Sequence, residues 1–421
     1  MVDRTDLQGL FPPGSGQADD GMLTVGGCRV DDLAGEFGTP VLVVSEAAMR
    51  LRAREYVDGL RARWTSSRVV FASKAFPCTA VQRVMVEEGL GLDVAGAGEI
   101  RAALRAGVDP ADLVLHGNAK SDEEMAMAVE HGLGLVVVDN FDDIDRLEAA
   151  ATADREQPVL VRVIPGVTAD THAHVLTGHE GSKFGLLPPD AARAITRIEA
   201  SPRLRMDGLH VHVGSQILDV EPFAASVAPL AALGEFPVYD LGGGLGVRYT
   251  YADKPPPVAD YLDALVGAAR EHLPADSTVI LEPGRSLVGT AGTTVYRVVT
   301  VKSSGNHTFV AVDGGMGDNL EVALFGQRFE ATVANRIGGG EEVTLVGRHC
   351  ESGDVLVDPV QLVDPAVGDL VAVPATGAYC YTMSNTYNGA RRIPVVFVRD
   401  GAARLVVRRD TWDDLMSRDV E

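Results

Sequence analysis

The sequence contains few cysteines, and their spacing excludes two common roles. Its 421 residues include only Cys28, Cys78, Cys350 and Cys380, which lie far apart and form no C-x-x-C pair. A disulfide framework or a structural zinc site would need more numerous or more closely spaced cysteines. We therefore predict neither a disulfide-stabilised fold nor a metal site.

Long apolar runs are also missing. No stretch approaches the ~20 apolar residues that span a bilayer, and the polar segment 1–21, rich in Gly and Pro, has no apolar core of the signal-peptide type. We therefore expect no membrane partner and a cytoplasmic location.

Positive charge is scarce as well. Lysine and arginine total 37 against 59 acidic residues, which gives a formal net charge of -22. Such a surface repels a phosphate backbone, so we expect no nucleic-acid partner. The 46% hydrophobic and 23% charged residues are typical of a soluble globular protein, and the length allows two domains.

The middle of the chain repeats one pattern. A short apolar, β-branched run is followed by a polar or glycine-rich turn and then by an amphipathic stretch with helical spacing. Helices are clearest at 99–107, 122–131 and 261–272. The predicted strands are 68–74, 91–95, 113–117, 135–139, 159–164, 208–213, 238–241 and 278–282.

Eight such units predict a (β/α)8 barrel of the TIM type, an α/β fold. A doubly wound sheet is the alternative, and it is less favoured because no G-x-G-x-x-G opens the first helix. Active sites of barrels lie at the C-terminal strand ends, and packing alone hardly explains the residues found there. These are Lys74, Asp93, His116, Asp139, Arg162, His212, Gly242 and Glu282.

The pattern changes after residue 285, where short strands follow one another without helices. This is typical of an antiparallel β domain, to which 25–44 also contributes strands. We predict an N-terminal segment joining the β domain (1–40), a barrel (41–285) and a C-terminal β domain (286–421). The predicted β-domain strands are 293–301, 307–312, 342–346, 369–373, 394–398 and 403–408.

Nine motifs occur along the chain in a fixed order. They are FASKAFP (71–77), GLDVAGAGE (91–99), HGNAK (116–120), SKFG (182–185), GLHVHVGSQI (208–217), LGGGLG (241–246), EPGR (282–285), HCESGD (349–354) and TGAYCYTMSNTYN (376–388). From Phe37 to its end the chain resembles the alanine-racemase-type (fold type III) barrel decarboxylases, and within them the diaminopimelate decarboxylases. The resemblance implies a decarboxylase that uses pyridoxal 5'-phosphate (PLP) and acts on an amino acid.

The resemblance implies three roles around the cofactor ring. Lys74 would form the Schiff base with PLP and later move a proton. Glu282 would bond the pyridine nitrogen and keep it protonated, because a protonated ring accepts the electrons left when CO2 departs. His212 would lie against the ring face.

Further residues match cofactor positions of the family. Glycines in such places let backbone N–H groups approach an anion closely. The residues expected at the phosphate, around the ring or near the substrate are Ser215, Gly244, Gly284, Arg285, Asp93, Glu99, Arg162 and Tyr379.

The HCESGD segment implies a homodimer with shared active sites. In the resembled family this segment comes from the other subunit, so Cys350 would donate a proton and Glu351 would face the substrate. Lys183 and Asp354 would pair across the interface. A shared site also implies that an isolated monomer is inactive.

The chain departs from the resembled family beside GGMGDN (314–319). Diaminopimelate decarboxylases carry an arginine and a tyrosine there for the distal carboxylate, whereas this chain has Glu321 and Phe325. Two unit charges about 4 Å apart at a dielectric near 20 interact by ~4 kcal/mol, or roughly 10³ in affinity. Arg285 remains as a possible partner of Glu321 or of the substrate.

Several functions stay open at this point. We favour a substrate with a neutral, cationic or conjugated distal end, such as a carrier-tethered precursor, over ordinary meso-diaminopimelate. A PLP racemase would need a second base, normally a tyrosine from the β domain, and HCESGD favours decarboxylation instead. Non-catalytic PLP-binding barrels lack a β domain.

Overall fold

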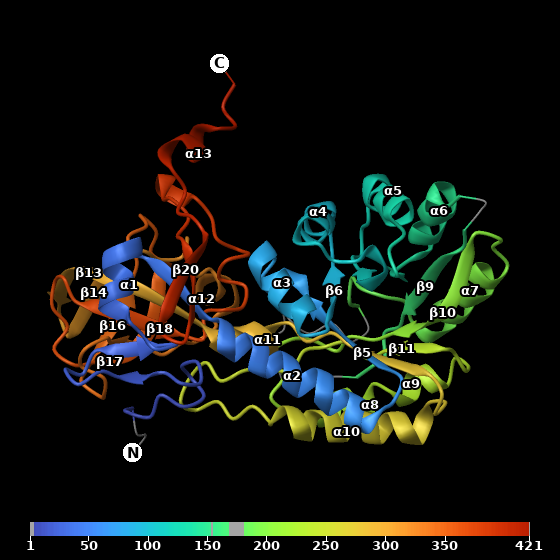
Figure 1. The fold of residues 1–421 in the computed structure, drawn as a ribbon, viewed down its shortest axis with the longest axis horizontal. Helices are drawn as coiled ribbons and strands as arrows, with labels where there is room; N and C mark the ends of the chain where they lie inside the picture. Colours follow the sequence, from blue (N-terminus) through green and yellow to red (C-terminus); the bar gives the residue numbers. More distant parts are fainter. Residues whose placement is uncertain (1–3, 153–154, 168–180, 421) are drawn as a thin grey trace. The chain divides into compact units, whose positions relative to one another are not determined.

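The eight predicted barrel strands close into one parallel barrel. The computed structural model describes residues 4–152, 155–167 and 181–420, and its strand order is β10-β11-β12-β5-β6-β7-β8-β9 (Figure 1). Every neighbouring pair is parallel, and Ile280 of the last strand faces Arg68 of the first. The strands are β5 Ser67–Ala72, β6 Gly91–Val94, β7 Leu113–Leu115, β8 Leu135–Val138, β9 Gln157–Arg162, β10 Leu204–His210, β11 Val238–Asp240 and β12 Thr278–Leu281.

Helices follow the strands as the sequence predicts. The expected helices appear as α4, α5 and α10. Ser121 begins α5 with a capping box, and Gly132 ends it in the left-handed conformation. The helices along this part of the chain are α2 Glu46–Arg63, α3 Thr79–Glu87, α4 Ala97–Ala106, α5 Asp122–His131, α6 Phe141–Ala150, α7 Pro188–Glu199, α8 Glu221–Ala225, α9 Ala228–Ala231, α10 Val258–His272 and α11 Arg285–Val288.

The second sheet is mixed rather than purely antiparallel. It runs β17-β16-β14-β13-β4-β19-β20, while β18 pairs with β13 and β15. The pairs β14–β16 and β4–β19 are parallel, and the other pairs of this sheet are antiparallel, as predicted. The strands are β4 Val41–Ser45, β13 Gly292–Ser304, β14 His307–Val312, β15 Thr332–Val333, β16 Glu341–Val346, β17 Val355–Leu362, β18 Leu370–Pro374, β19 Val395–Arg399 and β20 Ala402–Val407.

All six strands predicted after residue 285 are present, but β15 and β17 were missed. Strand β17 contains the pair Asp358–Pro359, and a proline normally argues against a strand interior. Strand β15 has only two residues, too few to show alternation.

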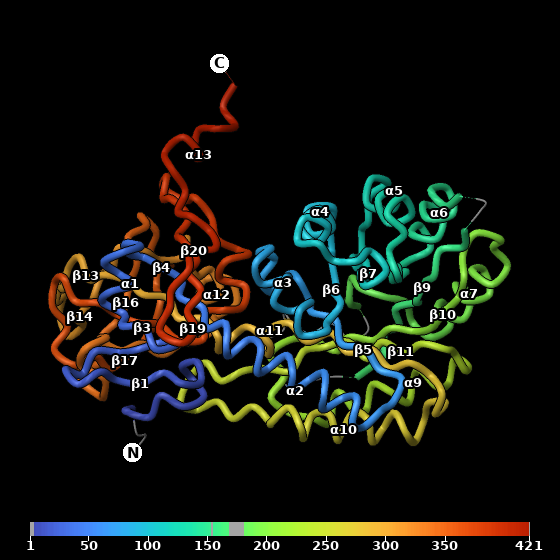
Figure 2. The backbone as a smooth tube through the Cα atoms, in the orientation of Figure 1, coloured from blue at the N-terminus to red at the C-terminus, as the bar shows by residue number. Residues whose placement is uncertain are grey.

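The chain forms two compact units. The barrel unit comprises Arg50–Gly246 and Pro255–Ser286, and the β unit comprises Met1–Met49, Val247–Lys254 and Leu287–Glu421. Figure 2 colours the backbone by residue number, so the segments that make up each unit can be followed along the chain.

The units divide the chain at other points than the predicted domains. Residues 41–49 belong to the β unit because β4 lies between β13 and β19. Segment 247–254 also belongs there, because Tyr249 is fully buried in that unit's core and its ring meets Phe329 edge to face.

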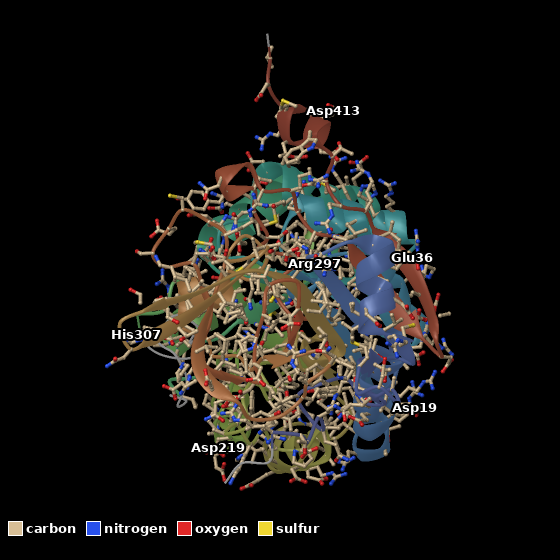
Figure 3. The ribbon with its side chains drawn as sticks, turned by 90° about the vertical axis from the view of Figure 1, so that its left-hand side faces the viewer. Asp19, Glu36, Asp219, Arg297, His307 and Asp413 are labelled. Atoms are coloured by element: carbon tan, nitrogen blue, oxygen red, sulfur yellow. The ribbon has the colours of Figure 1, made fainter. Side chains whose placement is uncertain are left out.

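The surface carries much of the charge. Asp19, Glu36 and Asp413 of the β unit are exposed, and their side chains lie at the periphery of Figure 3. Among the helices that the structure describes, none is long and apolar enough to cross a membrane.

Candidate active site

Four buried side chains meet at the C-terminal ends of the barrel strands. Glu282 follows β12, His116 follows β7, and His210 and Asp240 end β10 and β11. One side-chain nitrogen or oxygen atom from each residue lies within 4.8 Å of the corresponding atoms of the other three. Nε2 of His116 is 2.5 Å from Oε1 of Glu282, and Nε2 of His210 is 3.1 Å from Oε2.

This cluster is held together by ion pairing. Two histidines and two carboxylates form a donor set that a divalent metal could use. Metal–nitrogen and metal–oxygen bonds of ~2.0–2.2 Å keep neighbouring donors of one ion well apart, whereas His116 and Glu282 already touch. We therefore interpret the cluster as a carboxylate paired with histidines.

Glu282 is held in its charged form although it is only 5% exposed. Burial alone would raise the pKa of Glu282, but the nearby His116 and His210 outweigh burial and hold that pKa well below its usual value. The pKa of His116 is raised, because Asp93 and Glu282 together outweigh the effect of burial. A permanent carboxylate at this point suits a protonated pyridine nitrogen.

His212 is a neutral imidazole with a defined orientation. Burial and the positive charges of Lys74 and Arg162 hold the pKa of His212 well below its usual value. Its Nδ1 accepts the N–H of Gly243 at 3.3 Å, which leaves the proton on Nε2.

Lys74 lies just past β5 in a short 3₁₀ helix, η1 Ser73–Ala75, and not in the strand. Its side chain is exposed, and its positive charge partly opposes the burial that raises the pKa values of Asp93 and Glu99. Gly284 packs under this turn, since a Cβ there would meet Cβ of Ala72 at 2.9 Å. The amine is thus presented at the mouth of the barrel.

Two charged groups support the site. Asp93, inside β6, is 3.9 Å from His116, and burial raises its pKa. Arg162, at the end of β9, is also buried. Its guanidinium nitrogen Nη1 lies 3.5 Å from Oδ2 of Asp139. These contacts bring predicted ends of β6, β7, β8 and β9 into one region.

The glycine loop after β11 is required by backbone packing. A Cβ on Gly242, Gly243 or Gly244 would come within 2.1–2.3 Å of a carbonyl oxygen of a neighbouring loop. Nearby, Nε of Arg285 donates to Oγ of Ser215 at 3.3 Å. A cationic guanidinium, a hydroxyl and a tight glycine loop are a set of groups that fits a phosphate, so these residues fit the expected cofactor.

The β unit carries the HCESGD segment. Cys350 is exposed, and its backbone N–H donates to Oδ1 of Asn388 at 2.8 Å. Glu351 is exposed as well. These two consecutive residues expose a thiol and a carboxylate that a partner subunit could contact.

Asp354 is only 3% exposed, and its two oxygens accept the N–H groups of Met316 and His349 at 2.6 Å. Lys183 lies over the ring of Phe184 at 4.9 Å. The predicted pair of Lys183 with Asp354 across a dimer stays a prediction.

Glu321 is turned into the β unit. It begins the short helix α12 Glu321–Phe325, is 1% exposed, and its Oε2 accepts the hydroxyl of Tyr249 at 3.3 Å. Phe325, at the other end of α12, is half-buried.

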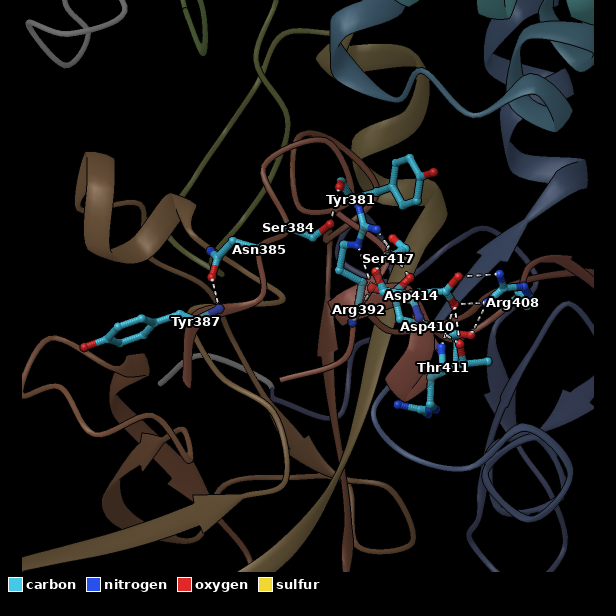
Figure 4. A network of polar contacts seen from close by, with 11 residues as sticks. Tyr381, Ser384, Asn385, Tyr387, Arg392, Arg408, Asp410, Thr411, Asp414 and Ser417 are labelled. Carbon is cyan, nitrogen blue, oxygen red and sulfur yellow. Dashed lines mark hydrogen bonds and ion pairs between the residues drawn. The ribbon is translucent and has the colours of Figure 1, made fainter. Parts of the chain in front are cut away.

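The segment that follows Tyr379 in the chain is fixed by short-range bonds (Figure 4). Ser384 donates to the carbonyl of Tyr381 at 2.7 Å, and the N–H of Tyr387 donates to Asn385 at 3.0 Å. Tyr379 itself has φ +65°, which is an outlier for a bulky residue. Strain of this kind concentrates at functional sites, which supports its predicted place near substrate.

Sequence reasoning missed His210 and Asp240. A signal was present, because both are polar residues at the ends of buried strands, the feature that pointed to the other candidates. The predicted strands 208–213 and 238–241 ran one to three residues too far, since β10 ends at His210 and β11 at Asp240. The predicted strands therefore place these two residues in strand interiors and not at strand ends.

The pyridoxal binding domain of the pyridoxal-dependent decarboxylases matches residues 49–289, more than half of the chain. The chain belongs to the pyridoxal-dependent decarboxylases. It is therefore an enzyme, a PLP-dependent carboxy-lyase, and the decarboxylase interpretation is confirmed over the racemase and the non-catalytic carrier.

Relatives of this decarboxylase are similar along the whole chain. A diaminopimelate decarboxylase from Actinosynnema pretiosum subsp. auranticum is 43% identical over 98% of this chain and 95% of its own length. One from Mycobacterium tuberculosis (H37Rv) is 41% identical over 98% of both chains.

A solved structure is also similar to this decarboxylase. The diaminopimelate decarboxylase of M. jannaschii in complex with L-lysine superimposes with a TM-score of 0.91 at 29% identity, covering 98% of this chain and 99% of that one. The decarboxylase is thus diaminopimelate decarboxylase-like, with the PLP barrel and β domain expected from its motifs.

Proposed function

We propose that the enzyme decarboxylates meso-diaminopimelate and releases lysine. The observation that carries the proposal is the 41–43% identity to diaminopimelate decarboxylases along 98% of the chain. The burial of Glu321 against Tyr249 supports it, because a carboxylate hydrogen-bonded inside the β unit repels a distal carboxylate less than one pointing into the site.

Different residues of the barrel unit have different proposed roles toward the cofactor. Lys74 would carry the cofactor, Glu282 would hold its ring nitrogen protonated, and His212 would face the ring. Ser215, Gly244 and Arg285 would hold the phosphate. When bound, pyridoxal phosphate supplies an electron sink for the pair left by the breaking C–CO2 bond.

The β unit completes the reaction from a second subunit. Cys350 would give its thiol proton to the carbon that lost CO2, and Glu351 would face the substrate. Independently of the subunit it comes from, Tyr379 would lie near the cofactor and the substrate. The exposure of Cys350 and Glu351 supports this arrangement, in which a homodimer has two shared sites.

A second candidate is a substrate whose distal end is not a free carboxylate. The specific observation is that Glu321 and Phe325 stand where the resembled family has an arginine and a tyrosine. A neutral, cationic, conjugated or carrier-tethered end would not need those two groups.

Steady-state kinetics with meso-diaminopimelate separate the two candidates. For the first candidate we expect CO2 release with kcat/KM of ~10⁴ M⁻¹s⁻¹ or above. For the second, the wild type is slow and Glu321→Arg with Phe325→Tyr raises kcat/KM, mainly through KM, by restoring a bidentate cation and a hydroxyl donor.

Two variants control this experiment. Phe325→Tyr alone should do little for the second candidate, because the acidic residue remains. Glu341→Arg changes the same charge at an exposed position of β16 and should leave kcat/KM unchanged. A wild type that is slow with diaminopimelate contradicts the first candidate, and a fast wild type contradicts the second.

A further inference from the structure

A second carboxyl lies beside Glu282 and has no part in the proposed reaction. Asp240, the last residue of β11, is 0% exposed. Its Oδ1 accepts the N–H of Gly242 at 2.9 Å. Its Oδ2 is buried and has no hydrogen-bond partner of regular geometry among the residues that the structure describes.

The histidines of the cluster are directed at Glu282. His116 and His210 contact its two oxygens at 2.5 and 3.1 Å, and their rings meet edge to face with centroids 4.9 Å apart. Neither histidine is within ion-pair distance of Asp240 in the described part of the chain. Burial lowers the pKa of His210 to about 4, so the counter-charge comes from His116, which contacts Glu282 and not Asp240.

The buried carboxylates of Asp240 and Glu282 have oxygen atoms within 4.8 Å of each other, and two buried carboxylates this close do not both remain ionised. Burial and the negative charge of Glu282 raise the pKa of Asp240 well above its usual value, and Asp93 adds to the effect, while the Gly242 N–H opposes it. A protonated Asp240 has an O–H whose nearby acceptor is Glu282, and this removes the unpaired buried oxygen.

We propose that Asp240 is a positioning residue, a neutral carboxylic acid that donates a hydrogen bond to Glu282 and orients that carboxylate toward the ring nitrogen of the cofactor. The inference rests on the proposed function of Glu282. A neutral donor fixes the carboxylate without adding a second negative charge under the ring.

Asp240→Asn is the decisive variant. Asparagine keeps the shape, the acceptor for Gly242 and a neutral donor for Glu282, whereas Asp240→Ala removes the donor. We expect Asp240→Asn to bind pyridoxal phosphate within about threefold of the wild type, and Asp240→Ala to bind ~10-fold more weakly or worse, as for a hydrogen bond to a charged group. Asp58→Asn, an exposed change in α2, is the matched control.

Infrared difference spectra of the cofactor-free full chain give an independent readout. Wild type minus Asp240→Asn should show the C=O stretch of a protonated carboxylic acid at neutral pH, whereas wild type minus Asp58→Asn should show carboxylate bands. Circular dichroism establishes that each variant is folded.

Three outcomes would overturn the proposal. They are carboxylate bands in the Asp240→Asn difference spectrum, loss of cofactor binding in that folded variant, and a bound metal that chelators remove from the wild type but that Asp240→Asn lacks. If the protonated band is present but Glu282→Gln leaves cofactor binding and turnover unchanged, the role proposed for Glu282 fails and the protonation of Asp240 stands.

Discussion

At the residue scale, the proposed covalent attachment of the cofactor to Lys74 can be tested directly. Lys74→Ala should remove the visible absorbance of the lysine-bound cofactor and essentially all CO2 release. Lys302→Ala, an exposed change in β13, is the control and should alter neither. A Lys74→Ala enzyme that keeps both the absorbance and turnover contradicts the central assignment.

The titration of Glu99 makes the free energy of unfolding depend on pH. Burial, outweighing the N–H of Ala95 at 2.6 Å, raises its pKa to about 7 from an ordinary 4.5. Between these two values the folded chain holds a proton that the unfolded chain has lost, so the free energy of unfolding falls as pH rises, by up to ~1.4 kcal/mol per pH unit.

Glu99→Gln should abolish this contribution. Urea unfolding of the cofactor-free protein between pH 4.5 and 7.5 should show the variant gaining stability over the wild type as pH rises. Glu123→Gln, at an exposed position of α5, should run parallel to the wild type. A parallel Glu99→Gln curve would show that Glu99 titrates normally.

At the scale of elements, the loop after β11 positions the carboxylate that follows β12. A Cβ on Gly243 would meet the carbonyl oxygen of Glu282 at 2.1 Å, so Gly243→Ala must displace one of the two backbones. We expect cofactor affinity to fall at least ~10-fold, because a displaced Glu282 no longer meets the ring nitrogen.

Gly267→Ala is the control for that experiment. Gly267 lies inside α10, and a Cβ added there would have nothing within 4 Å apart from its own helix. Replacing a helical glycine by alanine stabilises by up to ~1 kcal/mol. This variant should bind cofactor normally and unfold at slightly higher urea. Equal behaviour of the two glycine variants would contradict the packing argument.

At the scale of the whole molecule, the proposed shared site can be tested by mixing subunits. Cys350→Ala should bind cofactor but turn over ~10²–10⁴ more slowly, the usual loss for a general acid. Mixing it with Lys74→Ala protein should restore part of the activity, because a mixed dimer contains one intact site. Demonstrated subunit exchange without recovered activity would rule out the shared site.

The sequence by itself determined the barrel and the existence of its eight strands. The strands are apolar, β-branched runs of about the right length, and each turn after them is polar, so the period of the pattern predicted all eight. The motifs around Lys74, His212 and Glu282 predicted the cofactor for the same reason, since each motif is local.

Only the tertiary structure decided where strands end and which side chains meet. Strand β4 joined the β unit because its partners, β13 and β19, lie far later in the chain, and local patterns carry no information about such pairing. Asp240 and His210 could be recognised as site residues only in the tertiary structure. Their chemistry depends on a distance to Glu282, and closure of the barrel sets that distance.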